Sequence, residues 1–266
     1  MRQSLATLLS LGLVAAVACG AVAAEGGKEV DLALVLAVDV SRSMDPDEQQ
    51  LQREGYVEAL RSPAVHAAIR KGAIGRIAVA YVEWSGVAEQ KVVMPWTVIE
   101  GAASANAFAD QLAEAPIGRV YSTSISAAID FSVRLLEQSG FDAERRVIDI
   151  SGDGPNNTGR AVNRARDEAV AADIIINGLP FMLKRPNGFG DMENLDRYYE
   201  DCVIGGVGAF VVPIRSRTEI IEATRTKLIR EISAAPDPEP AVVPAQGRES
   251  VNCMIGEMRR QQQWGP

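Results

Sequence analysis

Hydrophobic and polar positions alternate with two different periods between residues 30 and 232. Short apolar runs with the length of buried strands are followed by stretches in which apolar residues recur at helical spacing. Strands are predicted from about residue 30 to Asp39 and over residues 76–84, 91–96, 146–150, 173–177 and 209–213. Helices are predicted over residues 46–60, 63–72, 104–113, 124–136, 160–171, 194–202 and 217–232. This alternation is typical of an α/β fold: a doubly wound, mainly parallel central sheet with helices on both faces.

The first 24 residues have the pattern of a signal peptide. Arg2 gives a positive start, residues 5–18 are apolar, and the small residues 21–24 precede Glu25, so cleavage is expected near Ala23 or Ala24. An uncleaved membrane anchor and lipidation at Cys19 stay open as alternatives, although Ala16 stands where a lipoprotein signal usually has leucine. The pattern predicts a periplasmic or secreted protein, without stable membrane insertion after cleavage.

The remaining chain divides into three parts. Residues 25–233 have the length and apolar content of one α/β domain with a substantial core. Residues 234–247 form a proline-rich segment, for which an extended linker is predicted. Residues 248–266 are a C-terminal tail, in which residues 249–263 favour a short helix.

The balance of charge is acidic. The full chain has a net charge of -8, and loss of the signal peptide would remove Arg2 but no acidic residue, which gives -9. Such a surface repels phosphate backbones and anionic lipids, so neither a nucleic-acid partner nor membrane binding is expected.

Two cysteines, Cys202 and Cys253, remain after the predicted cleavage. In an oxidising compartment an even pair favours a disulfide, which would tether the tail to the domain. Two separate free thiols are the alternative, because cysteine also serves as a small core residue.

The richest chemistry follows the first strand. Asp39, Ser41 and Ser43 place one carboxylate and two hydroxyls at alternate positions where the apolar run ends. These hard oxygen ligands favour Mg²⁺, Mn²⁺ or Ca²⁺ over zinc or copper. Open α/β sheets hold their ligands at the carboxyl ends of the strands, which supports a cation site at this position.

Two later segments supply further oxygen atoms. Thr123 stands in a run of hydroxyl residues directly before a predicted helix, and Asp153 with Gly154 follows the strand that ends at residue 150. Each has a plainer interpretation by itself, since Thr123 or Ser124 can cap a helix and Asp-Gly is common in turns.

Taken together, these segments resemble the von Willebrand factor A (vWA) domain superfamily. Its metal-ion-dependent adhesion site (MIDAS) consists of Asp-x-Ser-x-Ser, a threonine before a later helix, and an aspartate followed by glycine. The matching positions in this chain are Asp39, Ser41, Ser43, Thr123 and Asp153. The segments 151–157 and 198–206 look most similar to a group of secreted bacterial members that has no assigned function.

The resemblance implies a non-enzymatic binding module. In the family, the serines and the threonine bind the cation directly and the aspartates act largely through water, so the ion stays electrophilic and accepts a carboxylate from a partner protein. Integrin β-type domains also carry adjacent acids for a second cation. Here Pro46 interrupts the acids that follow the motif, so a second cation is not implied.

Two other functions stay open at this stage. A metal-dependent hydrolase would need a general base, for which Glu83 is the nearby candidate. A structural assembly domain would use the metal only to stabilise its loops. His66, the single histidine, is expected to be a surface residue or a hydrogen-bonded helix residue, and not part of a catalytic triad or zinc site. Trp84 and Trp96 are expected to pack in the core or at its rim. Residues 183–191 form a polar loop that could contribute to specificity.

Overall fold

The computed structural model describes residues 28–118, 122–183, 192–233 and 250–264. The predicted signal peptide, the proline-rich linker and most of the 183–191 loop lie outside these ranges. Within them, no helix is both long enough and apolar enough to cross a membrane.

The strands of the described residues form one mostly parallel sheet in the order β3-β2-β1-β4-β5. β1 pairs in parallel with β2 and with β4, β4 pairs in parallel with β5, and β3 pairs antiparallel with β2. The strands are β1 (Lys28–Asp39), β2 (Ile77–Trp84), β3 (Gln90–Ile99), β4 (Phe141–Gly152) and β5 (Ile174–Pro180).

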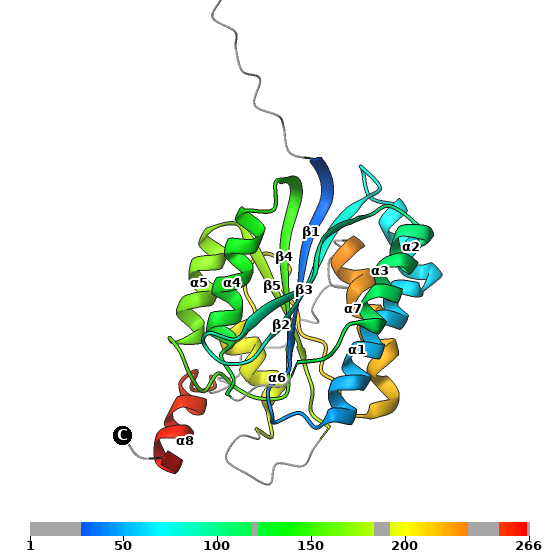
Figure 1. The fold of residues 1–266 in the computed structure, drawn as a ribbon. Helices are drawn as coiled ribbons and strands as arrows, with labels where there is room; N and C mark the ends of the chain where they lie inside the picture. The colour runs from blue at the N-terminus through cyan, green and yellow to red at the C-terminus, as the bar shows by residue number, and fades with distance from the viewer. Residues whose placement is uncertain (1–27, 119–121, 184–191, 234–249, 265–266) are drawn as a thin grey trace, which may run out of the picture.

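Helices cover both faces of this sheet (Figure 1). One face carries α1 (Pro46–Arg61), α2 (Pro63–Arg70), α3 (Ala102–Glu114) and α7 (Ile220–Ser233). The other carries α4 (Ile125–Glu137), α5 (Val162–Ala171), α6 (Leu195–Tyr198) and the π-helical turn η1 (Tyr199–Val203). The short 3₁₀ turn η2 (Arg217–Glu219) precedes α7, and α8 (Ile255–Trp264) lies near the C-terminus. The predicted doubly wound α/β fold is therefore confirmed.

The burial of the strands explains why their sequences read as continuous apolar runs. From Val30 to Asp39 every residue of β1 is buried, and the whole of β2 is buried as well. Helices on both faces leave no solvent side for polar residues in such central strands. β3 lies at the edge of the sheet, where Lys91 and Pro95 are exposed.

Local capping sets the start of α1 immediately after the Asp-x-Ser-x-Ser segment. The Asp45 carboxylate accepts a hydrogen bond from the Glu48 backbone N–H, and the Glu48 carboxylate accepts one from the Asp45 N–H. Pro46 occupies the first helical position, where its missing N–H costs nothing. This capping box fixes the point at which the loop after β1 turns into a helix.

The predicted strand over residues 209–213 is wrong. The chain there runs beside β5 through isolated bridges, which pair Gly178 with Val211 and Phe181 with Ile214. Gly206 and Gly208, with positive φ angles, belong to the turn that precedes this segment, and Pro213 within it has no N–H to donate, so its pairing with β5 is not a regular ladder. β4 is also longer than predicted, since it begins at Phe141 instead of residue 146.

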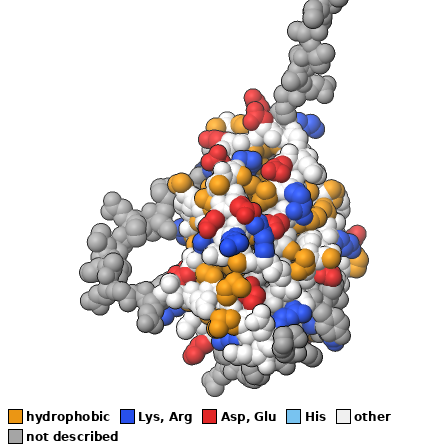
Figure 2. Space-filling view, turned by 90° about the vertical axis from the view of Figure 1, so that its left-hand side faces the viewer, with side chains coloured by type: hydrophobic (Ala, Val, Ile, Leu, Met, Phe, Trp, Pro, Cys, Tyr) orange, Lys and Arg blue, Asp and Glu red, His pale blue; other side chains and the backbone are white. Residues whose placement is uncertain are grey.

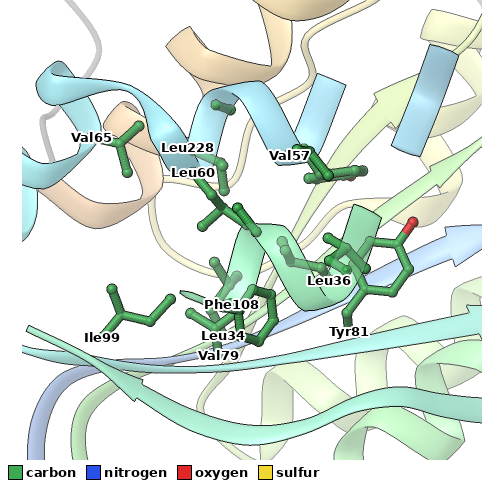
Figure 3. Close-up of a cluster of buried hydrophobic side chains, with 14 of the residues drawn as sticks. Leu34, Leu36, Val57, Leu60, Val65, Val79, Tyr81, Ile99, Phe108 and Leu228 are labelled. Atoms are coloured by element: carbon green, nitrogen blue, oxygen red, sulfur yellow. The ribbon is translucent and has the colours of Figure 1, made fainter. Parts of the chain in front are cut away.

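Apolar side chains fill the space between the sheet and its helical layers. Figure 3 shows this packing on the α1 side, where Leu34 and Leu36 of β1 meet Leu60 of α1 and Phe108 of α3. All four side chains are almost fully buried. Each such side chain contributes about 1.5–3 kcal/mol of transfer free energy.

The outer surface over α4 and α5 carries acidic and basic side chains side by side (Figure 2). Arg160 pairs there with Asp130 at 2.5 Å and with Glu168 at 2.7 Å. Partly exposed pairs of this kind contribute little stability, but they keep this surface polar.

A buried ionic cluster lies on the opposite face, between β4 and α7. The Lys227 ammonium contacts Asp149 at 2.5 Å and also pairs with Glu231, one helical turn away. Asn177 donates a hydrogen bond of 3.0 Å to Glu231, and the Tyr56 hydroxyl donates one of 3.2 Å to Asp149. Burial, followed by the negative charge of Asp149, raises the pKa of Glu231 to about 7 from an ordinary value of 4.5.

This pKa shift predicts the pH dependence of a Glu231→Gln variant. Because the folded-state pKa is raised, Glu231 takes up a proton on folding between pH 4.5 and 7, and its contribution to stability is lost as the pH rises through that window. The variant lacks this loss, so its free energy of unfolding relative to the parent should rise by about 1–3 kcal/mol between pH 5 and pH 8. Urea denaturation at several pH values measures the difference.

Glu222→Gln is the matched control, because Glu222 lies on the same helix with an exposed side chain. Its offset from the parent should not change with pH. Parallel profiles for Glu231→Gln and the parent would contradict the prediction.

Candidate metal centre at the carboxyl edge of the sheet

The parallel pairing of β1 and β4 brings two carboxylates to the same edge of the sheet. Asp39 is the last residue of β1, and Asp153 follows directly after the end of β4 at Gly152. β1 and β4 are neighbours, and Val38 is in register with Ser151. Parallel strands share a carboxyl edge, so residues far apart in the sequence meet there.

A chain of hydrogen bonds joins four of the five predicted site residues. Asp39 Oδ1 accepts a hydrogen bond of 2.7 Å from the Ser41 backbone N–H. The hydroxyls of Ser41 and Ser43 share a bond of 2.8 Å, and Ser43 Oγ donates to Asp153 Oδ1 at 2.6 Å. Oxygen atoms from both strand ends therefore form one continuous group.

Thr123, the fifth residue, is placed by backbone bonds. Its N–H donates to Asn157 Oδ1 at 3.1 Å, and its carbonyl accepts from the Asn157 N–H at 2.9 Å. Asn157 belongs to the turn that follows Asp153, so this turn holds the threonine loop. Among the described residues, the Thr123 hydroxyl makes no hydrogen bond to the other four.

The burial of the group changes steadily from the interior to the surface. Asp39 and Ser41 are completely shielded, Asp153 is half-buried, and Ser43 is exposed. A ligand can therefore approach this group from solvent over Ser43, while Asp39 closes its inner side.

The electrostatics of Asp39 fit a bound cation. Burial raises the pKa of Asp39 well above its ordinary value, the charge of Asp153 raises it further, and the bonds from Ser41 oppose both effects. Its second oxygen, Oδ2, is buried and has no hydrogen-bond partner among the described residues. A buried carboxylate beside a second carboxylate is costly, and a divalent cation would remove that cost for both.

Gly152 makes room for this unpaired oxygen. A Cβ at Gly152 would lie 2.9 Å from Asp39 Oδ2, closer than real Cβ atoms approach, and 3.1 Å from the Tyr199 hydroxyl, which is a tight contact. Tyr199, in η1, is fully buried, and its hydroxyl also has no hydrogen-bond partner among the described residues. Asp39 Oδ2 and the Tyr199 hydroxyl thus both border the space that a Cβ at Gly152 would occupy. The sequence pattern alone gave no indication that Tyr199 lies at the site.

The helix that follows the motif supports the loop after β1. Gln52 Nε2 donates to the Asp39 carbonyl at 3.1 Å, and Gln49 Nε2 donates to the Ser41 carbonyl at 3.3 Å. Both glutamines lie on one side of α1 and are buried. The sequence analysis did not predict this role, and the signal that could have indicated it is a pair of glutamines three residues apart in the first half of the predicted helix.

Glu83, the candidate general base, is engaged elsewhere. It forms a buried ion pair of 2.5 Å with Arg53, and its other oxygen accepts a hydrogen bond of 2.9 Å from the Gly118 N–H. Arg53 also donates to the carbonyls of Leu112 and Ala115. This arrangement anchors the segment that leads from α3 toward Thr123 and leaves neither oxygen of Glu83 free of a donor.

The other candidate residues lie in structural positions. His66 is buried in α2, and its Nε2 lies 2.7 Å from the Leu60 carbonyl. Trp84 is fully buried in the core, while Trp96 donates to the Leu135 carbonyl and packs edge-on against Phe141. In the part of the chain that the structure describes, no three side chains of histidine, cysteine, aspartate or glutamate form a metal-binding group. The candidate centre therefore depends on hydroxyls with two carboxylates.

The crowding around Gly152 predicts a specific cost for Gly152→Ala. The added methyl must displace the Asp39 carboxylate or the Tyr199 ring, so the free energy of unfolding should fall by about 1–3 kcal/mol. Gly101→Ala is the matched control, since a Cβ there meets nothing within 4 Å. Chemical denaturation measures both variants, and equal stability of the two would refute the steric account.

Comparisons with known proteins extend this picture. A family model described as "Protein of unknown function (DUF1194)" matches residues 29–236. No curated protein matches the chain.

Several solved structures share the fold. A von Willebrand factor type A protein from Catenulispora acidiphila is 13% identical with a TM-score of 0.54, and the match covers 76% of this chain and 43% of that one. Pilus adhesin SpaC from Lactobacillus rhamnosus GG is 12% identical with a TM-score of 0.54, over 78% of this chain and 30% of SpaC. The chain thus spans less than half the length of these proteins.

Proximal thread matrix protein 1 from the mussel byssus is 13% identical with a TM-score of 0.55, and the match covers 78% of this chain and 49% of that one. A second structure of the mussel protein, described as having a zinc-occupied MIDAS motif, is 12% identical with a TM-score of 0.50, over 75% and 46% of the two chains. At such low identity these matches show the fold alone, and they confirm the predicted vWA-like fold.

Proposed function

The chain belongs to the DUF1194 family, and we propose that it is a vWA-type binding module that holds one divalent cation and docks a carboxylate of a partner protein. The observation that carries the proposal is the hydrogen-bonded chain from Asp39 through Ser41 and Ser43 to Asp153, in which Asp39 Oδ2 is buried without a hydrogen-bond partner among the residues that the structure describes. These oxygen atoms, with the Thr123 hydroxyl, would hold the cation.

The chemistry of the donors favours a hard cation. Three hydroxyls and two carboxylates suit Mg²⁺, Mn²⁺ or Ca²⁺, and these five residues include no thiolate or imidazole that would select a softer ion. Zinc in the MIDAS motif of the mussel protein supports occupation of such a motif by a divalent ion. The only negative charges of the set are those of Asp39 and Asp153, so the bound ion would still attract an anionic ligand.

The exposure of Ser43 supports docking at the surface. A partner carboxylate would approach over Ser43 and Asp153, while Asp39 and Ser41 stay shielded behind them. The net charge of -8 disfavours nucleic acid as the partner. An adhesin and a byssal matrix protein among the structural matches support a role in protein-protein interaction.

Binding without catalysis is favoured by the residues around the centre. Hydrolysis needs a base with a free acceptor near the cation, whereas Glu83 is bonded to Arg53 and Gly118.

A periplasmic or secreted location is also part of the proposal. The Cys202–Cys253 disulfide supports this location, because disulfides persist in oxidising compartments.

The cation site is tested by calorimetry of Mn²⁺ and Mg²⁺ binding. Asp39→Asn keeps the shape of the side chain but removes its charge, and Thr123→Ala removes one ligand, so each should weaken the cation affinity by at least about tenfold. Asp47→Ala is the charge-matched control, because Asp47 is exposed in the first turn of α1. Equal affinity in all four proteins, with circular dichroism unchanged, would refute the site.

The choice between binding and catalysis is tested with one preparation. Capture of a partner from periplasmic extract should require Mg²⁺, should fail with chelator, and should be lost in Thr123→Ala. Phosphoester, ester and peptide substrates should not be turned over above background. Hydrolysis that disappears in Asp39→Asn would favour the enzyme, and capture that persists in chelator would favour a structural assembly domain.

A further inference from the structure

The C-terminal helix α8 lies close to the candidate metal centre. Figure 1 shows it at the end of the molecule where the strands have their carboxyl ends. A disulfide joins Cys253, just before α8, to Cys202 in η1. The Val251 N–H also donates to Asp201 at 2.8 Å, so the segment before the helix is attached at two points.

The first turn of α8 packs directly on the turn that follows Asp153. A Cβ at Gly256 would lie 2.0 Å from the Asn156 carbonyl oxygen, so only glycine allows the two backbones to approach this closely. Glu257 is 91% buried, and its carboxylate accepts a hydrogen bond of 2.7 Å from Asn156 Nδ2. The contact is therefore closely packed and specific.

The second turn of α8 contacts the residues that place Thr123. Arg260 Nη1 donates to Ser122 Oγ at 3.1 Å and to Asn157 Oδ1 at 3.3 Å. The same Asn157 oxygen accepts the Thr123 N–H, and Ser122 is the residue immediately before Thr123. Arg260 thus bonds to both groups that border the threonine.

The backbone conformation of Ser122 is the reason why its contact with Arg260 matters. Its φ angle of 75° lies in the left-handed region, which serine rarely adopts. Its carbonyl accepts a bond of 2.8 Å from Ser85 Oγ, and its own hydroxyl is held by Arg260. A residue in such a conformation needs partners on several sides, and α8 supplies one of them.

We propose that α8 is a positioning element of the cation site: Arg260 fixes the conformation of Thr123 through Ser122 and Asn157, and the Cys202–Cys253 disulfide holds the helix in place. The proposal rests on the proposed cation site. In consequence, a segment that supplies no ligand sets the cation affinity.

Two physical effects of removing Arg260 have opposite signs, which makes the proposal testable. Loss of a positive charge near a cation site should tighten cation binding by simple electrostatics. Loss of the bonds that position Thr123 should weaken it. A weaker affinity therefore identifies positioning as the dominant effect.

The experiment measures Mn²⁺ affinity by calorimetry on the full mature chain. We expect Arg260→Ala and the double variant Cys202→Ser/Cys253→Ser to raise the Kd three- to tenfold, with Arg260→Lys between the parent and Arg260→Ala. Two controls should match the parent: Gln262→Ala, exposed on α8, and Arg225→Ala, which removes an equal charge from the surface of α7. An unchanged or lower Kd in Arg260→Ala would overturn the proposal.

Hydrogen exchange without metal separates this inference from the proposed cation site. The Thr123 amide donates to Asn157, so it should exchange at least about tenfold faster in Arg260→Ala, while amides in β1 keep their rates. If the parent binds no Mn²⁺ but this local change appears, the cation function fails and the positioning role of α8 stands. Unchanged exchange at Thr123, or faster exchange throughout the sheet, would overturn the positioning role.

Discussion

A fully buried aspartate, one of whose oxygens has no hydrogen-bond partner in the described part of the chain, is the constraint around which the carboxyl edge of the sheet is organised. Asp39 is carried there by a strand whose apolar residues must be buried, so its position is a consequence of core packing. Asp153 follows directly after the end of the neighbouring strand β4 and adds a second negative charge. The Ser41 amide, the glycine at 152 and the loops of the edge are all arranged around these carboxylates.

Helix α1 connects this edge to the rest of the core. Gln49 and Gln52 bond to the loop after β1, while Arg53 reaches Glu83 on β2 and carbonyls at the C-terminal end of α3. The same helix packs Leu60 against the sheet, as Figure 3 shows. Polar bonds to the loops and apolar burial in the core therefore come from one rigid element, which limits how far the loops can move independently.

The sequence predicted the fold class and the carboxyl ends of β1 and β2, and it placed the end of β4 within two residues, because apolar runs mark where buried strands stop. Parallel strands share an edge, so these ends locate the site. It could not predict Tyr199, Asn156 or Asn157 as neighbours of the site. Their contacts depend on how segments at least 30 residues apart pack together, and no local period encodes that. Residues 209–213 were misread because apolar content suggested a strand, whereas the segment joins β5 through isolated bridges and contains Pro213, which has no N–H for a regular ladder.

The two edges of the sheet have a consequence for recognition. On one side, β3 presents the exposed residues Lys91 and Pro95, and its pairing with β2 is irregular near Tyr81. On the other side, bridges from Gly205, Val211 and Ile214 occupy the outer edge of β5. Charge, proline and covering segments of this kind prevent the addition of another strand. These features disfavour binding of a partner by extension of the sheet, as β-augmentation would require, and leave the loops at the strand ends as the surface for the proposed docking.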